Sequence, residues 1–110
     1  MTLKAEAKSH GREVKRIGAM AVGLCQGYSI GRDYEGPDRQ EAVLWYTLVM
    51  DAVRRHPKIV KIDPERSIRL FEAIKDAVRS IDDARNSNRP LALTFGVEQK
   101  RRLKELSRAS

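Results

Sequence analysis

The spacing of apolar residues predicts a first helix over residues 12–26. Val14, Ile17, Ala21 and Leu24 recur three and four positions apart, which places their side chains on one face of an α-helix. Several neighbouring residues are glycine or alanine, and such small residues let a second backbone approach closely. We therefore expect this helix to pack against another one, within the chain or in a second subunit. Residues 1–11 are polar and mixed in charge, and we expect them to fray or to lead into this helix.

A second helix is expected over residues 38–56. Asp38 can cap the free N–H groups of its first turn, and Glu41 completes a pair similar to a capping box just before an apolar run. Apolar residues cover almost every side of this helix, a pattern typical of a helix that is central to a bundle or covered by a partner. The sequence therefore predicts a homo-oligomer, most simply a homodimer, joined through helices 12–26 and 38–56.

The connection after the second helix is expected to be extended. Arg54, Arg55 and His56 are basic residues suited to a helix C-terminus, and Pro57 has no backbone N–H to donate, so the helix is expected to stop there. Two β-like stretches, 59–62 and 91–95, are candidates for a minor two-stranded ladder.

Two more helices follow this connection. Pro64, placed after the capping residue Asp63, predicts the start of a helix over residues 64–85. Its apolar residues repeat at spacings of three and four: Ile68, Phe71, Ile74, Val78 and Ile81. A last helix, over about residues 97–107, has Leu103 and Leu106 on its expected buried side.

The expected fold class is mainly all-α. A chain of 110 residues, 41% of them hydrophobic, can build one compact core. We therefore expect a single domain over residues 1–110, made of four helices with at most a minor β ladder. Residues 1–11 are the candidate flexible segment, and residues 96–110 hold a basic C-terminal helix.

Composition restricts the class of protein further. One cysteine excludes an internal disulfide, and one cysteine with two histidines is too few for a four-ligand zinc site. We expect no metal and no cofactor. The most apolar run, residues 42–50, is nine residues long, whereas a membrane-spanning helix needs about 20. No apolar stretch typical of a secretory signal follows the first residues, so we expect a cytoplasmic protein without a membrane partner.

Positive charge is the most informative feature of the sequence. The chain has 22 Lys and Arg against 15 Asp and Glu, a net charge of +7. The excess gathers in two clusters: Arg54, Arg55, Lys58 and Lys61, and then Lys100, Arg101, Arg102 and Lys104. Clustered cations neutralise phosphates and release counterions. The clusters therefore predict nucleic-acid binding, with DNA favoured over RNA, although an ordinary solvated surface could carry the same residues.

A glycine-rich segment, residues 27–37, is expected to be a loop. Its glycines match neither the dinucleotide-binding nor the P-loop spacing, so phosphate cradling is not indicated. Tyr28, Arg32 and Tyr34 make it a candidate contact loop, because an arginine between two aromatic residues suits stacking and phosphate contact.

Catalytic chemistry is not indicated by the sequence. His10 and His56 are 46 positions apart with no nucleophile beside either, and Cys25 follows an apolar stripe, where a free cysteine usually packs as a small hydrophobe. We expect a non-enzymatic, basic helical protein that binds nucleic acid as a regulatory or accessory factor. The alternative is a helical adaptor or inhibitor that docks on an acidic partner protein.

Overall fold

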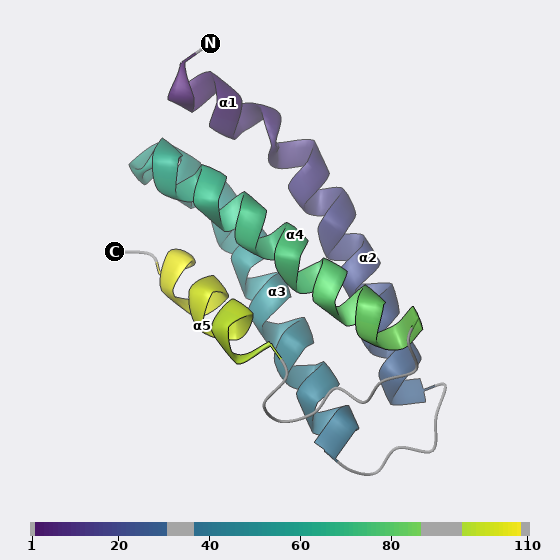
Figure 1. Ribbon diagram of the computed structural model, residues 1–110. Helices are drawn as coiled ribbons and strands as arrows, with labels where there is room; N and C mark the ends of the chain where they lie inside the picture. Colours follow the sequence, from purple (N-terminus) through teal and green to yellow (C-terminus); the bar gives the residue numbers. More distant parts are fainter. Residues whose placement is uncertain (1, 31–36, 87–95, 109–110) are drawn as a thin grey trace.

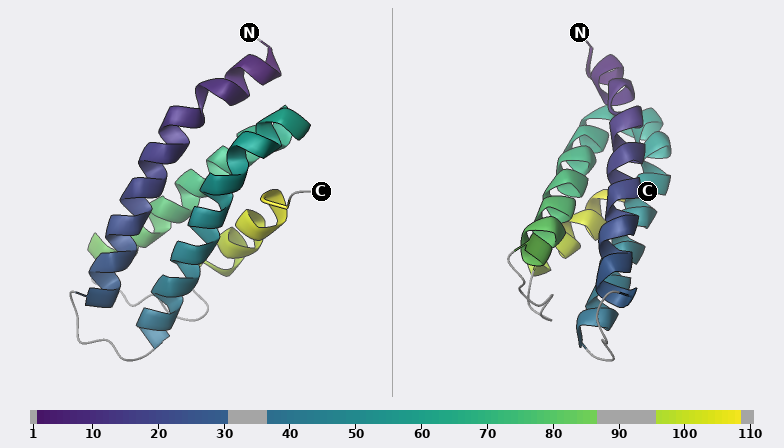
Figure 2. Two further views of the ribbon diagram at one scale, coloured as in Figure 1. Left: turned by 180° about the vertical axis from the view of Figure 1, so that it is seen from behind. Right: turned by 90° about the vertical axis from the view of Figure 1, so that its right-hand side faces the viewer.

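The computed structural model describes residues 2–30, 37–86 and 96–108, nearly all of which lie in helices (Figure 1). The helices are α1 (Leu3–Ser9), α2 (Gly11–Ile30), α3 (Pro37–Ile62), α4 (Pro64–Asn86) and α5 (Val97–Leu106). The all-α prediction is confirmed, and α2 to α5 are the four expected helices. Figure 2 shows α3 between α2 and α5, with α4 packed across one side of all three.

The N-terminal residues form a short helix rather than a frayed end. Thr2 caps α1 through its Oγ1 atom, which accepts a hydrogen bond from the Ala5 backbone N–H at 3.1 Å. Ala7 is fully buried, and α1 packs on α3 and α4. The burial of Ala7 and the cap at Thr2 therefore stabilise this polar segment as a helix. A break at His10 separates α1 from α2.

The expected stop at Pro57 is wrong, because α3 continues through the proline to Ile62. Ile59 and Val60 are both buried beyond it. Burial of an apolar side chain of this size stabilises by about 1.5–3 kcal/mol, so the pair offsets the cost of about 3 kcal/mol for proline inside a helix. Residues 59–62 are helical, so they do not form the predicted two-stranded ladder with residues 91–95. Residues 91–95 themselves lie outside the described part of the chain.

The expected loop at residues 27–37 is also wrong at both of its ends. Residues 27–30 belong to the last turn of α2, so the backbone of Tyr28 is helical, and Pro37 begins α3. Arg32 and Tyr34, the other two residues of the candidate contact loop, lie outside the described residues.

The core is built where the four helices meet. The apolar stripe predicted on α2 is buried as expected, and the α4 stripe is buried at Phe71, Ile74, Val78 and Ile81. Trp45 and Val49 from α3 and Leu103 from α5 complete the core. A Cβ added at Gly18 would lie 3.0 Å from Cγ2 of Val53, so this glycine allows the close approach of α2 and α3. The α2 stripe is therefore covered within one chain and does not need a second subunit.

Candidate nucleic-acid interface

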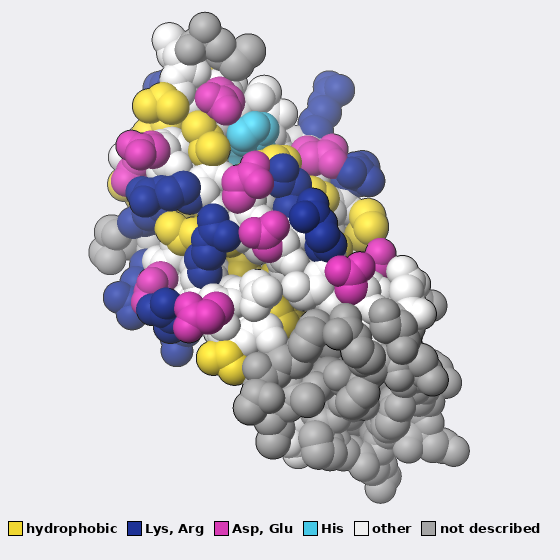
Figure 3. All heavy atoms as spheres, in the orientation of Figure 1, with side chains coloured by type: hydrophobic (Ala, Val, Ile, Leu, Met, Phe, Trp, Pro, Cys, Tyr) yellow, Lys and Arg dark blue, Asp and Glu magenta, His cyan; other side chains and the backbone are white. Residues whose placement is uncertain are grey.

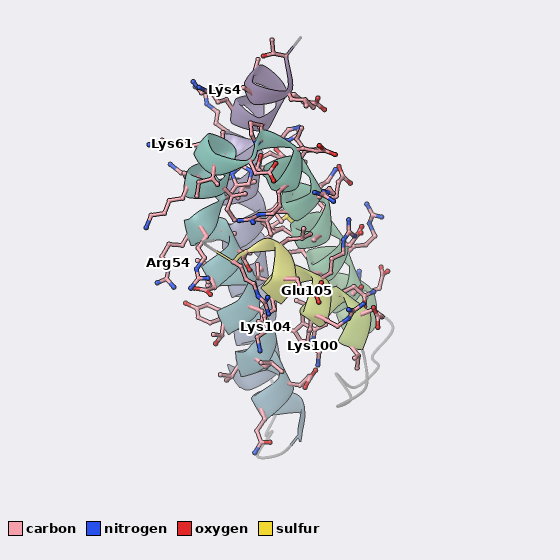
Figure 4. The ribbon with its side chains drawn as sticks, turned by 90° about the vertical axis from the view of Figure 1, so that its left-hand side faces the viewer. Lys4, Arg54, Lys61, Lys100, Lys104 and Glu105 are labelled. Atoms are coloured by element: carbon pink, nitrogen blue, oxygen red, sulfur yellow. The ribbon has the colours of Figure 1, made fainter. Side chains whose placement is uncertain are left out.

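Three cations of the first cluster form a row along the exposed face of α3. Arg54, Lys58 and Lys61 are exposed and follow one another at spacings of four and three, which places them on one helix face. At a rise of 1.5 Å per residue the row spans about 10 Å. Figure 4 shows Arg54 and Lys61 projecting from the same side of α3. We call these three residues the basic row.

Carboxylates compensate little of the charge of the basic row. Arg54 pairs with Asp51, one turn earlier, in a contact that leaves most of the Arg54 side chain exposed. Lys58 and Lys61 have no ion pair with any described residue, and no acidic residue occurs from 52 to 62. An exposed pair such as Arg54 with Asp51 contributes only about 0–1 kcal/mol. The row therefore keeps its cations available to an anionic partner.

Arg55, the remaining cation of the first cluster, points to α5 instead. Its Nη1 atom donates to the carbonyl oxygen of Ser107 at 3.1 Å, and its Nη2 atom lies 3.5 Å from a carboxylate oxygen of Asp51. This arginine thus ties α3 to the C-terminal end of α5, where a cation satisfies a carbonyl that the helix leaves without a partner.

The second cluster is divided between buried and exposed side chains. Lys100 makes an ion pair with Glu41 of α3; only 11% of the lysine side chain and 3% of the glutamate side chain are exposed. Its ammonium also lies 5.6 Å from the centroid of a Trp45 ring. Because its charge is already engaged inside the protein, Lys100 serves to dock α5 on α3.

The other cations of α5 lie outside the core. Arg101 pairs with Glu98 at 2.8 Å and with Glu105 at 3.3 Å on its own helix, and the hydrogen bond that it donates to Glu98 raises the pKa of Arg101. Arg102 reaches Asp76 of α4 at 3.2 Å. Lys104 is exposed and has no ion pair within the described residues, and it lies on the side of the molecule seen in Figure 4 with the basic row.

The face formed by α4 and α5 is mixed in charge. Figure 3 shows Lys and Arg side chains interspersed with Asp and Glu over these helices. Among the described residues, α3 thus has more cations without a carboxylate partner than α5 has. A count of charges along the sequence gives both clusters equal weight and does not distinguish them.

The two histidines come together although they are 46 positions apart. His56 is 1% exposed, and its Nε2 atom and the Nδ1 atom of His10 are both buried without a hydrogen-bond partner. The His10 ring stacks on Phe71 with centroids 4.2 Å apart. Burial lowers the pKa of His56, and the charge of His10 lowers it further, while a backbone hydrogen bond with Ser67 opposes the shift.

The burial of His56 corrects its expected place at a helix end. His56 lies within α3, four positions after the buried Ala52 and three before the buried Ile59. His10 similarly lies between the buried residues Ala7 and Val14. The helical spacing of these apolar neighbours is the sequence signal that places His56 inside the protein and His10 partly buried.

Other kinds of site are not formed by the described residues. Among them, no group of three or more His, Cys, Asp or Glu side chains could hold a metal ion. None of the helices in the described ranges is both long and apolar enough to span a bilayer.

Comparison with known proteins finds no matching family model, no matching curated protein and no matching solved structure.

Proposed function

We propose that this protein binds the phosphate backbone of nucleic acid, with duplex DNA favoured, through the basic row and Lys104. The observation that carries the proposal is the placement of Arg54, Lys58 and Lys61 on one exposed helix face, in an eleven-residue stretch without an acid. The role is non-enzymatic: a regulatory or accessory factor whose affinity comes from charge.

The structure of α3 suits contact with a phosphate backbone. A helix holds its side chains at fixed intervals, so the row presents its cations with about 6 Å between Arg54 and Lys58 along the helix axis. Lysine and arginine on such a face neutralise phosphates and release counterions, which gives affinity without sequence preference.

Duplex DNA is favoured over single strands because of the aromatic residues. Single-strand binders stack bases on exposed aromatic rings. Trp45 and Phe71 are buried, and Tyr46 is the one exposed aromatic among the side chains that the structure describes. On the described surface one exposed ring offers little stacking, so the backbone of a duplex is the better partner for the basic row.

Fluorescence anisotropy with a labelled random duplex tests the proposal directly. Four phosphate contacts predict a slope of about −3.6 for the logarithm of the binding constant against that of the salt concentration, hence a loss of about 10²-fold between about 50 and about 200 mM salt. We expect the matching single strand to bind more weakly. A binding constant that does not change with salt, or no binding at about 50 mM, would refute the proposal.

A second candidate function, docking on a protein partner, rests on a different observation. Val43, Leu44 and Tyr46 of α3 are 55%, 43% and 41% exposed, and exposed apolar groups close together mark interaction sites. In this second function the protein is an adaptor or inhibitor that binds an acidic partner protein through these three residues, with the basic row beside the contact.

A homodimer would use the same surface, because the α2 stripe is buried within the chain. Sedimentation at increasing concentration, with Leu44→Glu as the variant, tests for self-association through this surface.

A further inference from the structure

A cavity of about 200 Å³ lies where the junction of α1 and α2 faces the second half of α3. The proposed binding of nucleic acid does not involve its interior. Ala7, His56 and Val60 line it and are buried, so they form its floor. Pro57 adds an apolar ring to the wall. Apart from one imidazole, the interior is apolar.

The imidazole in the floor does not make the cavity charged. Because burial lowers the pKa of His56 from its ordinary value near 6.5, this side chain is neutral at pH 7. The floor therefore favours an uncharged, apolar group, which gains free energy when it leaves water for such a surface.

The charged groups of the cavity are at its mouth. Lys8 of α1 and Lys61 of α3 both line the cavity, and both are exposed. Neither ammonium makes an ion pair with a carboxylate among the residues that the structure describes. The cavity thus combines an apolar interior with two exposed lysines at its rim, which line it with their aliphatic stems and have no carboxylate partner among the described residues.

We propose that this cavity binds a small monocarboxylate with a compact apolar body, such as an aromatic acid. The apolar body would lie on Ala7 and Val60, and the carboxylate would remain at the mouth, near the ammonium groups of Lys8 and Lys61. The volume suits such a ligand, since an apolar cavity of about 150 Å³ holds benzene. A cation would be repelled at the mouth.

Binding of benzoate, followed by ¹H–¹⁵N NMR, tests this site. We expect saturable shift changes at residues around the cavity, with a dissociation constant on the order of 1 mM, which is typical of a ligand of this size. Benzyl alcohol has the same ring without the charge, and we expect it to bind about fivefold more weakly, the range of an exposed ion pair.

Two glycines of α2 provide a matched pair of variants. Gly11 lines the cavity, and a Cβ added there would meet no atom within 4 Å, so Gly11→Leu can place its side chain in the cavity without a clash at Cβ. Gly23 has equally open surroundings, and the cavity lining does not include it. We expect Gly11→Leu to weaken benzoate binding at least about tenfold, a loss of about 1.4 kcal/mol, and Gly23→Leu to leave it unchanged.

The charge at the mouth is tested through Lys8, because Lys61 also belongs to the basic row. Lys8→Gln removes one of the two lysine charges, so it should weaken benzoate about twofold and leave benzyl alcohol unchanged. The variant keeps Arg54, Lys58 and Lys61, so its result is independent of nucleic-acid binding.

Three results would overturn the proposal. The first is an absence of saturable shifts around the cavity with benzoate. The second is equal affinity in Gly11→Leu and Gly23→Leu, which would place the ligand elsewhere. The third is equal binding of benzoate and benzyl alcohol, which would remove the role of the two lysines. The Lys8→Gln comparison remains decisive if Gly11→Leu does not fold.

Discussion

The ion pair between Lys100 and Glu41 makes a strong prediction about stability. Lys100→Met removes the cation and leaves the Glu41 side chain, 3% exposed, as a buried carboxylate without its partner. Removing one member of a buried pair costs about 3–5 kcal/mol, because the remaining charge is no longer compensated. We therefore expect the free energy of unfolding to fall by about 3–5 kcal/mol in this variant.

Replacing both members of the pair separates the cost of an unpaired charge from the loss of contact. In Glu41→Leu/Lys100→Met no charge remains buried, and apolar replacements of a buried pair are often neutral or stabilising. We expect the double variant to be within about 1 kcal/mol of the natural sequence. The coupling energy of the cycle is then about as large as the effect of Lys100→Met alone.

Urea unfolding followed by fluorescence measures these differences. The chain has one tryptophan, Trp45, and the ammonium of Lys100 lies 5.6 Å from its ring, so the probe reports on the docking of α5. Arg16→Met is the control, because it breaks the exposed pair with Glu13 and should leave the free energy of unfolding almost unchanged. The reasoning is refuted if Lys100→Met matches this control, or if the double variant is no more stable than the single one.

The remaining predictions concern one glycine and one histidine. A Cβ at Gly96, where φ is +68°, would overlap the Trp45 ring, so Gly96→Ala should destabilise by about 1–3 kcal/mol and alter the fluorescence of Trp45. Gly23→Ala, in open space within α2, should instead stabilise by about 0.5–1 kcal/mol; equal effects of the two variants in urea unfolding would contradict this account. Because the pKa of His56 is lowered in the folded state, the unfolded chain binds more protons, so the free energy of unfolding is at its full value above about pH 6.5 and falls as the pH decreases below it. His56→Gln should reduce this decrease between about pH 7.5 and 5.5, and an unchanged pH dependence would show that another group causes it.

Local sequence rules predicted the helices well where apolar spacing and burial agree. The stripes of α2 and α4 are read from residues three and four positions apart, and both are buried in the structure except at Ile68, which is half-buried. The rule that proline ends a helix fails at Pro57, because the burial of Ile59 and Val60 outweighs the local cost. Only the packing of α3 against its neighbours, which no local pattern contains, decides this balance.

The charged residues of the candidate site show the same limit of local sequence rules, because the rules do not tell which cations are exposed. Lys100 and Lys104 are equivalent in the sequence, four positions apart in one basic cluster. The partner of Lys100 is 59 positions away on α3, so only the fold separates a docking residue from an exposed one. The sequence contains the basic row, because Arg54, Lys58 and Lys61 share a face of any helix that includes all three. The expected stop at Pro57 hides it, because that stop places Lys58 and Lys61 outside the helix.

The measurement that tests the central claim most directly compares two triple variants of equal charge. Arg54→Gln/Lys58→Gln/Lys61→Gln removes the basic row, and Lys15→Gln/Arg69→Gln/Arg79→Gln removes three exposed cations of α2 and α4. Both lower the net charge of +7 by three.

Binding of both variants to a labelled duplex is measured as a function of salt concentration. The account predicts that loss of the row decreases the magnitude of the salt slope by about 2.7 and that the control keeps the slope of the natural sequence. Equal slopes for the two variants would contradict it, because net charge and not the face of α3 would then determine the binding.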